Sequence, residues 1–254
     1  MVLMECKLCK KDFANLENSH VIPEWIYKPL YNEKHKFIEI NSNNFKKLKP
    51  EQKGYREKLL CKCCEAKFSK WETNAKKDLE DITNKKSKFL EITQLSNKFL
   101  FVENISYDYL KKFILSILWR MSVTSLEQFK GIKLGVFEEN LRGLLDADME
   151  IDTFTYPIMV RQLQVSGKHY KDVIMGVEKG RIQNKYIFQS FVAYGYMFDV
   201  VVSKLRFPSN FSELLLNQNG RMPVELTDVM SLPHDERLLN RLNDSDVLKF
   251  HNKI

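Results

Sequence analysis

The sequence predicts an α+β fold, in which a small cysteine-bearing module precedes a larger domain of mixed helices and antiparallel strands. Three observations support this prediction. All five cysteines lie within the first 64 of the 254 residues. A helical pattern follows the last cysteine, and segments rich in Tyr, Phe, Val and Ile, which are typical of strands, occupy much of the remainder. We expect the two parts to be residues 1–84 and 85–254.

The first module contains two Cys-x2-Cys pairs, Cys6 with Cys9 and Cys61 with Cys64. A gap of two residues allows both thiolates of a pair to reach one ion at about 2.3 Å, and two pairs complete the tetrahedral ligand set that zinc prefers. Four sulfur ligands leave no position for water, so we expect this zinc to be structural. The alternative is a set of buried, redox-inert thiols. Cys63 is expected to pack as a small hydrophobic residue.

The polar and apolar pattern of the first module predicts short elements before the helix. An extended segment at 18–22 leads to Pro23, which suits the first turn of a helix at 24–27. Residues 31–56 are largely polar and contain one alternating stretch at 36–40. We therefore expect an inserted hairpin or loop between two strands.

A helix is predicted over 62–81, because its apolar residues recur at intervals of three and four. The same spacing brings Glu65, Ser69 and Glu72 together on a neighbouring face. The apolar face consists of Phe68, Trp71, Ala75 and Leu79.

The second domain is expected to combine helices with antiparallel strands. Helical periodicity covers 107–123 and 136–146. Strand-like composition, with a turn or bulge at Gly195, covers 89–103, 156–165 and 186–205. The tail is expected to return to short helices at 224–229 and 236–242.

Charge is concentrated in the cysteine-bearing part of the chain. Residues 1–100 carry 21 Lys and Arg against 14 Asp and Glu, whereas the rest carries 19 of each, so the first part accounts for the whole net charge of +7. Such a field attracts polyanions, although a solvated lysine-rich surface is the alternative. No apolar run approaches the roughly 20 residues that cross a bilayer, and the first residues do not resemble a signal peptide. We expect a cytoplasmic protein without a membrane partner, in which thiols stay reduced.

His20 lies between the two cysteine pairs in the sequence, and Glu65 follows the second pair. These two residues suggest phosphodiester chemistry. Hydrolysis needs a base that works near neutral pH and a hard cation that stabilises charge on the phosphate. His20 has a suitable unperturbed pKa and precedes the helix along a strand that the zinc site would fix. Glu65 directly follows the last cysteine, and its carboxylate suits Mg²⁺. The alternatives are a structural histidine and a solvent-facing glutamate.

Taken together, these motifs resemble the HNH endonucleases. The similarity rests on the first cysteine pair, on the phrase Ser-His-Val-Ile-Pro at 19–23 and on Leu-Leu-Cys-x2-Cys-Glu at 59–65, and it covers residues 3–82. It is strongest toward a bacterial branch that also has Phe-Ser-x-Trp-Glu, found here at 68–72. The stretch 116–120 resembles the C-terminal part of those proteins. The resemblance implies a zinc-stabilised ββα-metal module of treble-clef type.

The resemblance also implies functional roles for individual residues. The protein would be a metal-dependent endonuclease, a hydrolase of phosphodiester bonds in which His20 activates the attacking water. Glu65 occupies the position of a metal-binding histidine, and Glu72, one turn beyond a further ligand position, is a second candidate for magnesium. Arg56 falls at the middle position of the motif, where the family has Asn, and is expected to clamp phosphate. Ser19 replaces the usual Asp or His ligand.

The expected cofactors are structural Zn²⁺ and catalytic Mg²⁺ or Mn²⁺. The expected partner is nucleic acid, in particular double-stranded DNA, contacted by Arg56, Lys58, Lys67 and Lys70. The resemblance suggests antiviral defence in bacteria, with a second copy of the chain or a defence-system protein as candidate partners. One alternative is a non-catalytic zinc module that binds nucleic acid or a protein. Another is an effector in which residues 85–254 sense a ligand.

Overall fold

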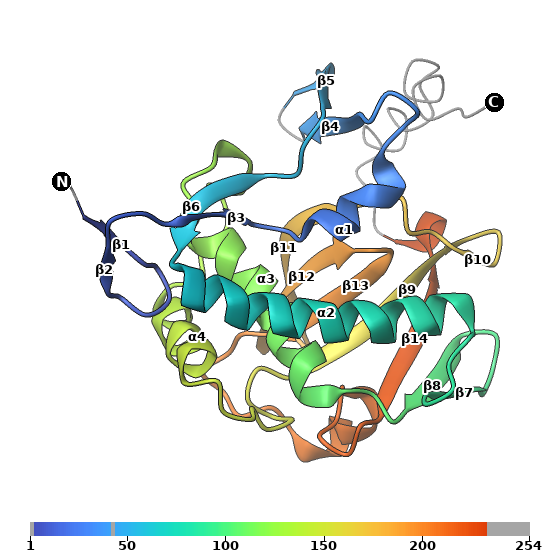
Figure 1. Ribbon diagram of the computed structural model, residues 1–254. Helices are drawn as coiled ribbons and strands as arrows, with labels where there is room; N and C mark the ends of the chain where they lie inside the picture. Colours follow the sequence, from blue (N-terminus) through green and yellow to red (C-terminus); the bar gives the residue numbers. More distant parts are fainter. Residues whose placement is uncertain (1–2, 42–43, 233–254) are drawn as a thin grey trace.

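The computed structural model describes residues 3–41 and 44–232, and between 40 and 48 it describes no side chains. Within the described part, a large twisted sheet is covered on one face by two long helices, and a group of short strands lies beyond the start of the first helix (Figure 1). The α+β class predicted from the sequence is confirmed. None of the helices in these ranges has the length and apolar content of a membrane span.

The N-terminal part is built from three small two-stranded sheets. β1 pairs with β2, β3 with β6 and β4 with β5, all antiparallel. The β4–β5 hairpin interrupts the connection between β3 and β6, which confirms the inserted hairpin. The bounds are β1 Met4–Glu5, β2 Asp12–Phe13, β3 Glu17–His20, α1 Glu24–Tyr27, η1 Lys28–Leu30, β4 Phe37–Asn41, β5 Asn44–Glu51 and β6 Arg56–Leu60.

Helix α2, Lys62–Asn84, starts directly after β6 and runs across the face of the large sheet (Figure 1). Its predicted apolar face is buried, because Phe68 and Trp71 are each 1% exposed. The helix continues three residues beyond the predicted end, since Ile82 is also buried. It stops where Lys85 adopts the left-handed conformation and donates its N–H to the last carbonyls, which is a common helix end.

The large sheet has eight strands: seven follow the order β11-β12-β13-β9-β14-β8-β7, and the short β10 pairs with β9. Neighbours are antiparallel except for β14 and β9, which are parallel. Gly195 forms the turn between β12 and β13 with φ +70°, as the predicted break requires. The bounds are β7 Glu91–Gln94, β8 Phe99–Glu103, β9 Ile158–Val165, β10 Lys168–His169, β11 Met175–Ile182, β12 Tyr186–Ala193, β13 Tyr196–Val201 and β14 Met222–Asp228.

Helix α3, Tyr107–Val123, matches its predicted range and packs against α2, and every side chain from Leu110 to Ser122 is buried. Helix α4, Val136–Ala147, packs against α3 and buries only its inner face. Three short 3₁₀ helices complete the described part: η2 Glu127–Phe129, η3 Ser209–Leu214 and η4 Val229–Ser231.

One hydrophobic cluster joins the two parts of the chain. It contains Leu59 and Phe68 from the first part together with Trp119 and Phe198 from the second. The tyrosine hydroxyl of Tyr196 also lies 3.2 Å from the Thr83 hydroxyl, across the interface between α2 and the sheet. The core is therefore continuous across residue 84, and the division of the chain there stays a prediction.

Two local expectations were wrong. Residues 224–229, expected as a helix, belong mainly to β14, because Val224 pairs with Leu100 of β8 and with Val160 of β9 and is fully buried. Pairing between distant segments outweighs local helical preference here. Cys63 is exposed rather than packed, since it lies on the outer side of the first turn of α2. The helix expected at 236–242 lies outside the described residues.

Candidate metal centre and neighbouring histidine site

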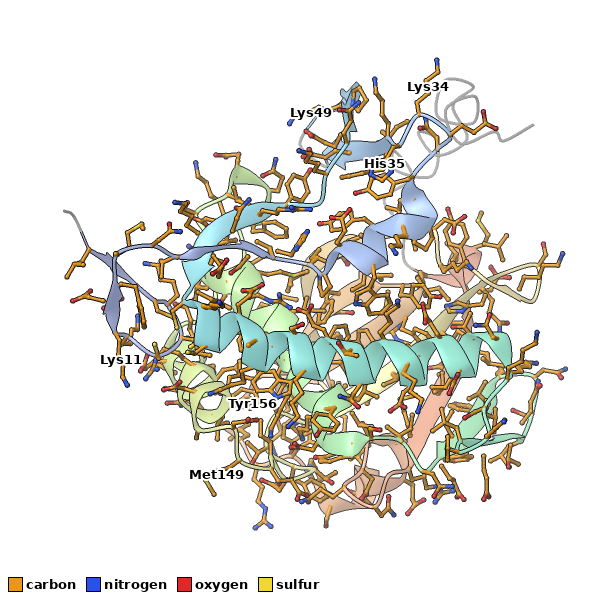
Figure 2. The ribbon with its side chains drawn as sticks, in the orientation of Figure 1. Lys11, Lys34, His35, Lys49, Met149 and Tyr156 are labelled. Atoms are coloured by element: carbon orange, nitrogen blue, oxygen red, sulfur yellow. The ribbon has the colours of Figure 1, made fainter. Side chains whose placement is uncertain are left out.

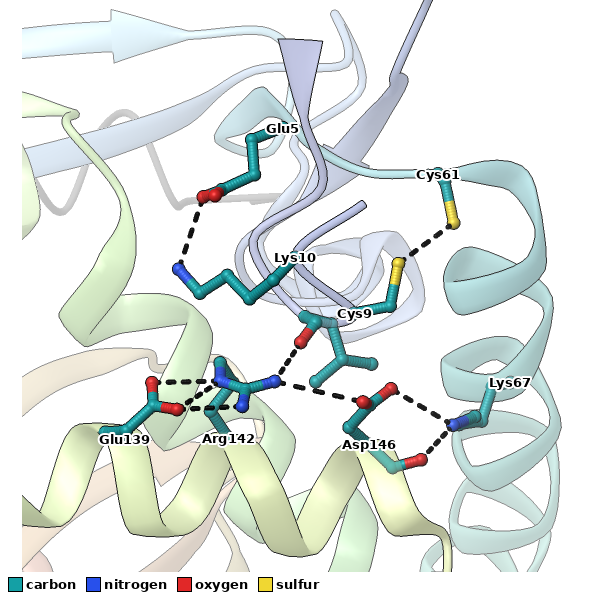
Figure 3. Close-up of polar contacts among 9 residues, drawn as sticks. Glu5, Cys9, Lys10, Cys61, Lys67, Glu139, Arg142 and Asp146 are labelled. Atoms are coloured by element: carbon teal, nitrogen blue, oxygen red, sulfur yellow. Dashed lines mark hydrogen bonds and ion pairs between the residues drawn. The ribbon is translucent and has the colours of Figure 1, made fainter. Parts of the chain in front are cut away.

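The four predicted cysteines come together at the N-terminal end of α2. The sulfur atoms of Cys6, Cys9, Cys61 and Cys64 all lie within 4.8 Å of one another, and the Cys9 and Cys61 sulfurs are 4.0 Å apart (Figure 3). A tetrahedron with Zn–S bonds of about 2.3 Å has sulfurs separated by about 3.8 Å. The cluster therefore has the composition and nearly the dimensions of a zinc site, and it can hold this ion.

Short backbone turns position the sulfurs. The Cys6 N–H donates to the Lys11 carbonyl and the Lys10 N–H to the Cys6 carbonyl, each at 2.9 Å, which closes the turn between β1 and β2. Lys10 takes the left-handed conformation that this turn needs. The Cys61 N–H, at the start of α2, donates to the Cys6 sulfur at 3.3 Å. Backbone donors of this kind stabilise a thiolate, which is the form that binds metal.

The protonation of the cluster also favours a metal. A hydrogen bond from Cys64 lowers the pKa of Cys6 to about 4, and the same contact raises the pKa of Cys64. Burial raises the pKa of Cys9. Neighbouring thiolates repel one another, so the four thiols cannot all lose their protons at the same pH. A divalent cation removes this repulsion and displaces the protons.

Helix α4 supports the first cysteine loop from outside (Figure 3). Arg142 donates to the carbonyl of Leu8, between the first two cysteines, and pairs with Glu139 at 2.7 Å. Asp146, one turn further on, accepts a hydrogen bond at its carbonyl from Lys67 of α2 at 2.6 Å. Helix α4 therefore stabilises the loop between Cys6 and Cys9 and contacts the start of α2.

Replacing Arg142 with Gln should weaken zinc binding without changing the ligands. Loss of the bond to the Leu8 carbonyl frees the loop, and removal of such an outer partner typically costs 10-fold to 100-fold in metal affinity. Competition with a chelator measures this affinity. Arg206→Gln, at an exposed position far along the chain, is the control. Equal zinc affinity in both variants would contradict the supporting role of α4.

A second polar cluster begins next to the cysteines. Ser19, near the end of β3, is fully buried, and its hydroxyl donates to the Glu65 carboxylate at 2.5 Å. This bond joins β3 to the first turn of α2. His20, the next residue of the strand, is half-buried and places its Nε2 3.0 Å from a carboxylate oxygen of Glu24. His20 directly follows the serine that contacts Glu65, but side chains of consecutive strand residues point to opposite faces. Among the described residues, no hydrogen bond or ion pair joins His20 to Glu65.

The environment of His20 keeps its imidazole neutral at physiological pH. Burial lowers the pKa of His20, and the positive charges of Arg56 and Arg120 lower it further, whereas Glu24 acts in the opposite direction. The pKa of His20 therefore lies below the ordinary histidine value of about 6.5. A neutral imidazole near neutral pH is the form that can accept a proton.

Glu24 is a site residue that the sequence reasoning missed. Besides His20, its carboxylate accepts hydrogen bonds from the Tyr31 hydroxyl at 2.7 Å and from Arg56 at 3.3 Å. Burial acts to raise the pKa of Glu24, but these three contacts lower it overall. The pattern available in the sequence was the four-residue spacing from His20, in the first turn of the helix that Pro23 starts.

Arg120 is the second missed residue, and it comes from α3. Its side chain is 1% exposed, donates to the His20 carbonyl at 2.7 Å and pairs with Glu72 at 2.9 Å. Glu72, predicted as a magnesium ligand, is therefore held by a buried cation. Burial raises the pKa of Glu72 although Arg120 opposes the shift. Arg120 ties the strand of His20 to the middle of α2.

The cations predicted to contact nucleic acid differ in their accessibility. Arg56, Lys58 and Lys70 are exposed. Lys58 donates to the Asn15 side chain at 2.9 Å, and Lys70 lies over the ring of Tyr109 at 5.5 Å. Lys67 is instead engaged by α4, as described above.

Other lysines gather where η1 and the β4–β5 hairpin lie. Lys34 and Lys49 project into solvent there, beside His35 (Figure 2). Lys34 and Lys49 both follow α1, which carries Glu24, in the sequence. Lys49 pairs with Glu51 and approaches Glu39 at 3.9 Å, so part of this charge is compensated.

No protein-family model, curated protein or solved structure matches this chain. The fold and the site together define an α+β protein with four clustered cysteines that could hold a zinc ion, beside a group of histidine and carboxylate side chains. Its function has to be argued from these residues.

Proposed function

We propose that the protein is a metal-dependent endonuclease of HNH-like type, which hydrolyses phosphodiester bonds of nucleic acid. The observation that carries this proposal is the hydrogen bond between Ser19 and Glu65. It links the end of an antiparallel strand pair to the first turn of the helix that follows, close to the four cysteines, and His20 is the next residue of that strand. A ββα unit of this kind is what the sequence resemblance predicts for residues 3–82.

In this proposal the residues divide the chemistry among them. His20 takes a proton from the attacking water, for which its neutral imidazole is suited. Glu65 supplies an oxygen ligand to Mg²⁺ or Mn²⁺, and the ion stabilises the charge that develops on the phosphate. Arg56 contacts phosphate oxygens from its exposed position. Zinc in the four-sulfur site has no open position and serves the fold alone.

The charge distribution supports an extended, anionic substrate. The exposed cations Arg56 and Lys58 lie on β6, which pairs with the strand of His20, so that His20 faces Arg56 in the register. Contacts to phosphate carry little sequence information, so we expect cleavage without a strong base preference. Double-stranded DNA is the substrate we expect. The sequence resemblance alone suggests a role in bacterial antiviral defence. It also suggests assembly with a second copy of the chain or with a defence-system protein.

Cleavage of supercoiled plasmid DNA in the presence of Mg²⁺ or Mn²⁺ tests the proposal. We expect the wild-type protein to cut, and His20→Ala to lower the rate by a factor of about 10² to 10⁴, as loss of a general base does. Glu65→Gln should lower it comparably and should raise the metal concentration required. Glu80→Gln, on the same helix and paired with Lys76 at 3.7 Å, is the matched control.

The pH dependence adds an independent criterion. Because the pKa of His20 lies below about 6.5, the rate should be constant near neutral pH and should fall as the solution becomes more acidic than this pKa. Zinc content must stay unchanged in His20→Ala and Glu65→Gln. Wild-type protein that retains zinc but cuts neither DNA nor RNA with either metal would rule out the enzyme.

The second candidate is a non-catalytic zinc module that binds nucleic acid or a protein partner. Two observations favour it: Ser19 occupies the usual position of a metal ligand, and Glu72 is already bound by Arg120. Both readings predict binding that weakens with salt. Only the nuclease predicts cleavage that requires a divalent cation and His20.

A further inference from the structure

The carboxylate of Glu24 contacts the His20 ring and two other side chains. One of its oxygens lies 3.0 Å from His20 Nε2 and 3.3 Å from an Arg56 nitrogen, and the other accepts the Tyr31 hydroxyl at 2.7 Å. Three separate elements, β3, β6 and the segment after η1, supply these partners. A carboxylate held from three sides has one orientation, and it can impose an orientation on the imidazole.

The group that accepts the hydrogen bond from the His20 ring determines which of the two ring nitrogens carries the proton. An ionised carboxylate can only accept hydrogen bonds, and the contacts from Tyr31 and Arg56 favour the ionised form of Glu24. Nε2 of His20 must therefore carry the proton that the contact at 3.0 Å requires. In a neutral imidazole the other nitrogen, Nδ1, then has the free lone pair.

The backbone of His20 is fixed as well. Arg120 donates to the His20 carbonyl at 2.7 Å, and the Val21 N–H donates to the Tyr55 carbonyl at 2.9 Å. Backbone and ring are thus held by different groups, and only the ring contact selects a tautomer.

We propose that Glu24 is a positioning residue for His20: its carboxylate accepts the Nε2 proton, holds one tautomer of the imidazole and leaves Nδ1 as the nitrogen that takes the proton from water. This inference rests on the proposed nuclease function for its consequence in catalysis. The tautomer itself is independent of any activity. Tyr31 and Arg56 act one step further out, because they hold the carboxylate.

Nuclear magnetic resonance of the full-length, zinc-loaded protein with ¹⁵N-labelled histidine tests the tautomer. His20 is assigned by its absence in His20→Gln. We expect Nδ1 to show the shift of an unprotonated nitrogen, and Nε2 to show an N–H signal that exchanges slowly with water. Glu24→Gln should lose this slow exchange and populate both tautomers, since an amide can donate as well as accept.

Two further variants separate positioning from general damage. Tyr31→Phe removes only one contact to the carboxylate and should produce a smaller change in the same direction. Glu33→Gln, an exposed residue two positions further along, should leave the His20 signals unchanged. Cleavage by Glu24→Gln should fall about 10-fold to 100-fold, with unchanged zinc content.

The outcomes distinguish this inference from the proposed function. A His20 spectrum that is identical in wild type and Glu24→Gln would overturn the positioning role, whatever the activity. Loss of the single tautomer in a protein whose wild type never cleaves nucleic acid would uphold the positioning role and overturn the nuclease.

Discussion

Cys64→Ser should abolish zinc binding and unfold the N-terminal part of the protein. Structural zinc contributes an apparent binding free energy of about 10–16 kcal/mol in small zinc modules, which is as large as the whole stability of a typical domain. Cys64 is buried among the three other sulfurs. Elemental analysis should find one zinc per wild-type chain and none in the variant, and the melting temperature of the variant should fall sharply.

Cys63→Ser is the matched control for this experiment. The two cysteines are adjacent in the first turn of α2, but Cys63 is exposed and belongs to no cluster of metal-binding groups in the described residues. It should keep its zinc and its melting temperature. Loss of zinc in Cys63→Ser together with retention in Cys64→Ser would show that the ligand set is wrong.

Arg120→Met should produce the second large effect, on the folding free energy. The substitution removes a cation that is 1% exposed and takes away the side-chain donor of Glu72 and of the His20 carbonyl. Removal of one partner of a buried ion pair costs about 3–5 kcal/mol. Urea unfolding of zinc-loaded protein measures the loss.

A double-mutant cycle with Glu72→Gln tests the origin of this effect. A buried neutral amide without a partner costs less free energy than a buried unpaired carboxylate. The double variant should therefore be less destabilised than the sum of the two single variants. Arg181→Met, on the exposed edge strand β11, should change stability by no more than about 0.5 kcal/mol. A loss of less than 1 kcal/mol in Arg120→Met would contradict the link between α3 and the His20 strand.

The sequence predicted those features that depend on local pattern. The spacing within each cysteine pair restricts the geometry of the sulfurs, and the periodicity of α2 matches the one face that it buries. The turn at Gly195 was likewise visible, because its positive φ suits glycine. In these places local preference and tertiary packing agree.

Features that depend on contacts between distant segments were not predictable. Strand β14 owes its conformation to β8 and β9, which precede it by more than 50 residues. Arg120 reaches His20 across 100 positions in the chain, and no spacing rule connects them. Glu24 was within reach of local reasoning, but its role depends on Arg56 and Tyr31, which the hairpin and the η1 turn bring to it.

Anomalous X-ray scattering from crystals soaked with Mn²⁺ and inorganic phosphate tests the central claim most directly. The account predicts a zinc peak about 2.3 Å from each of the four cysteine sulfurs and a separate manganese peak bound to the Glu65 carboxylate, with His20 facing the phosphate. A zinc peak without any manganese at Glu65 would contradict the catalytic site and leave a structural zinc protein.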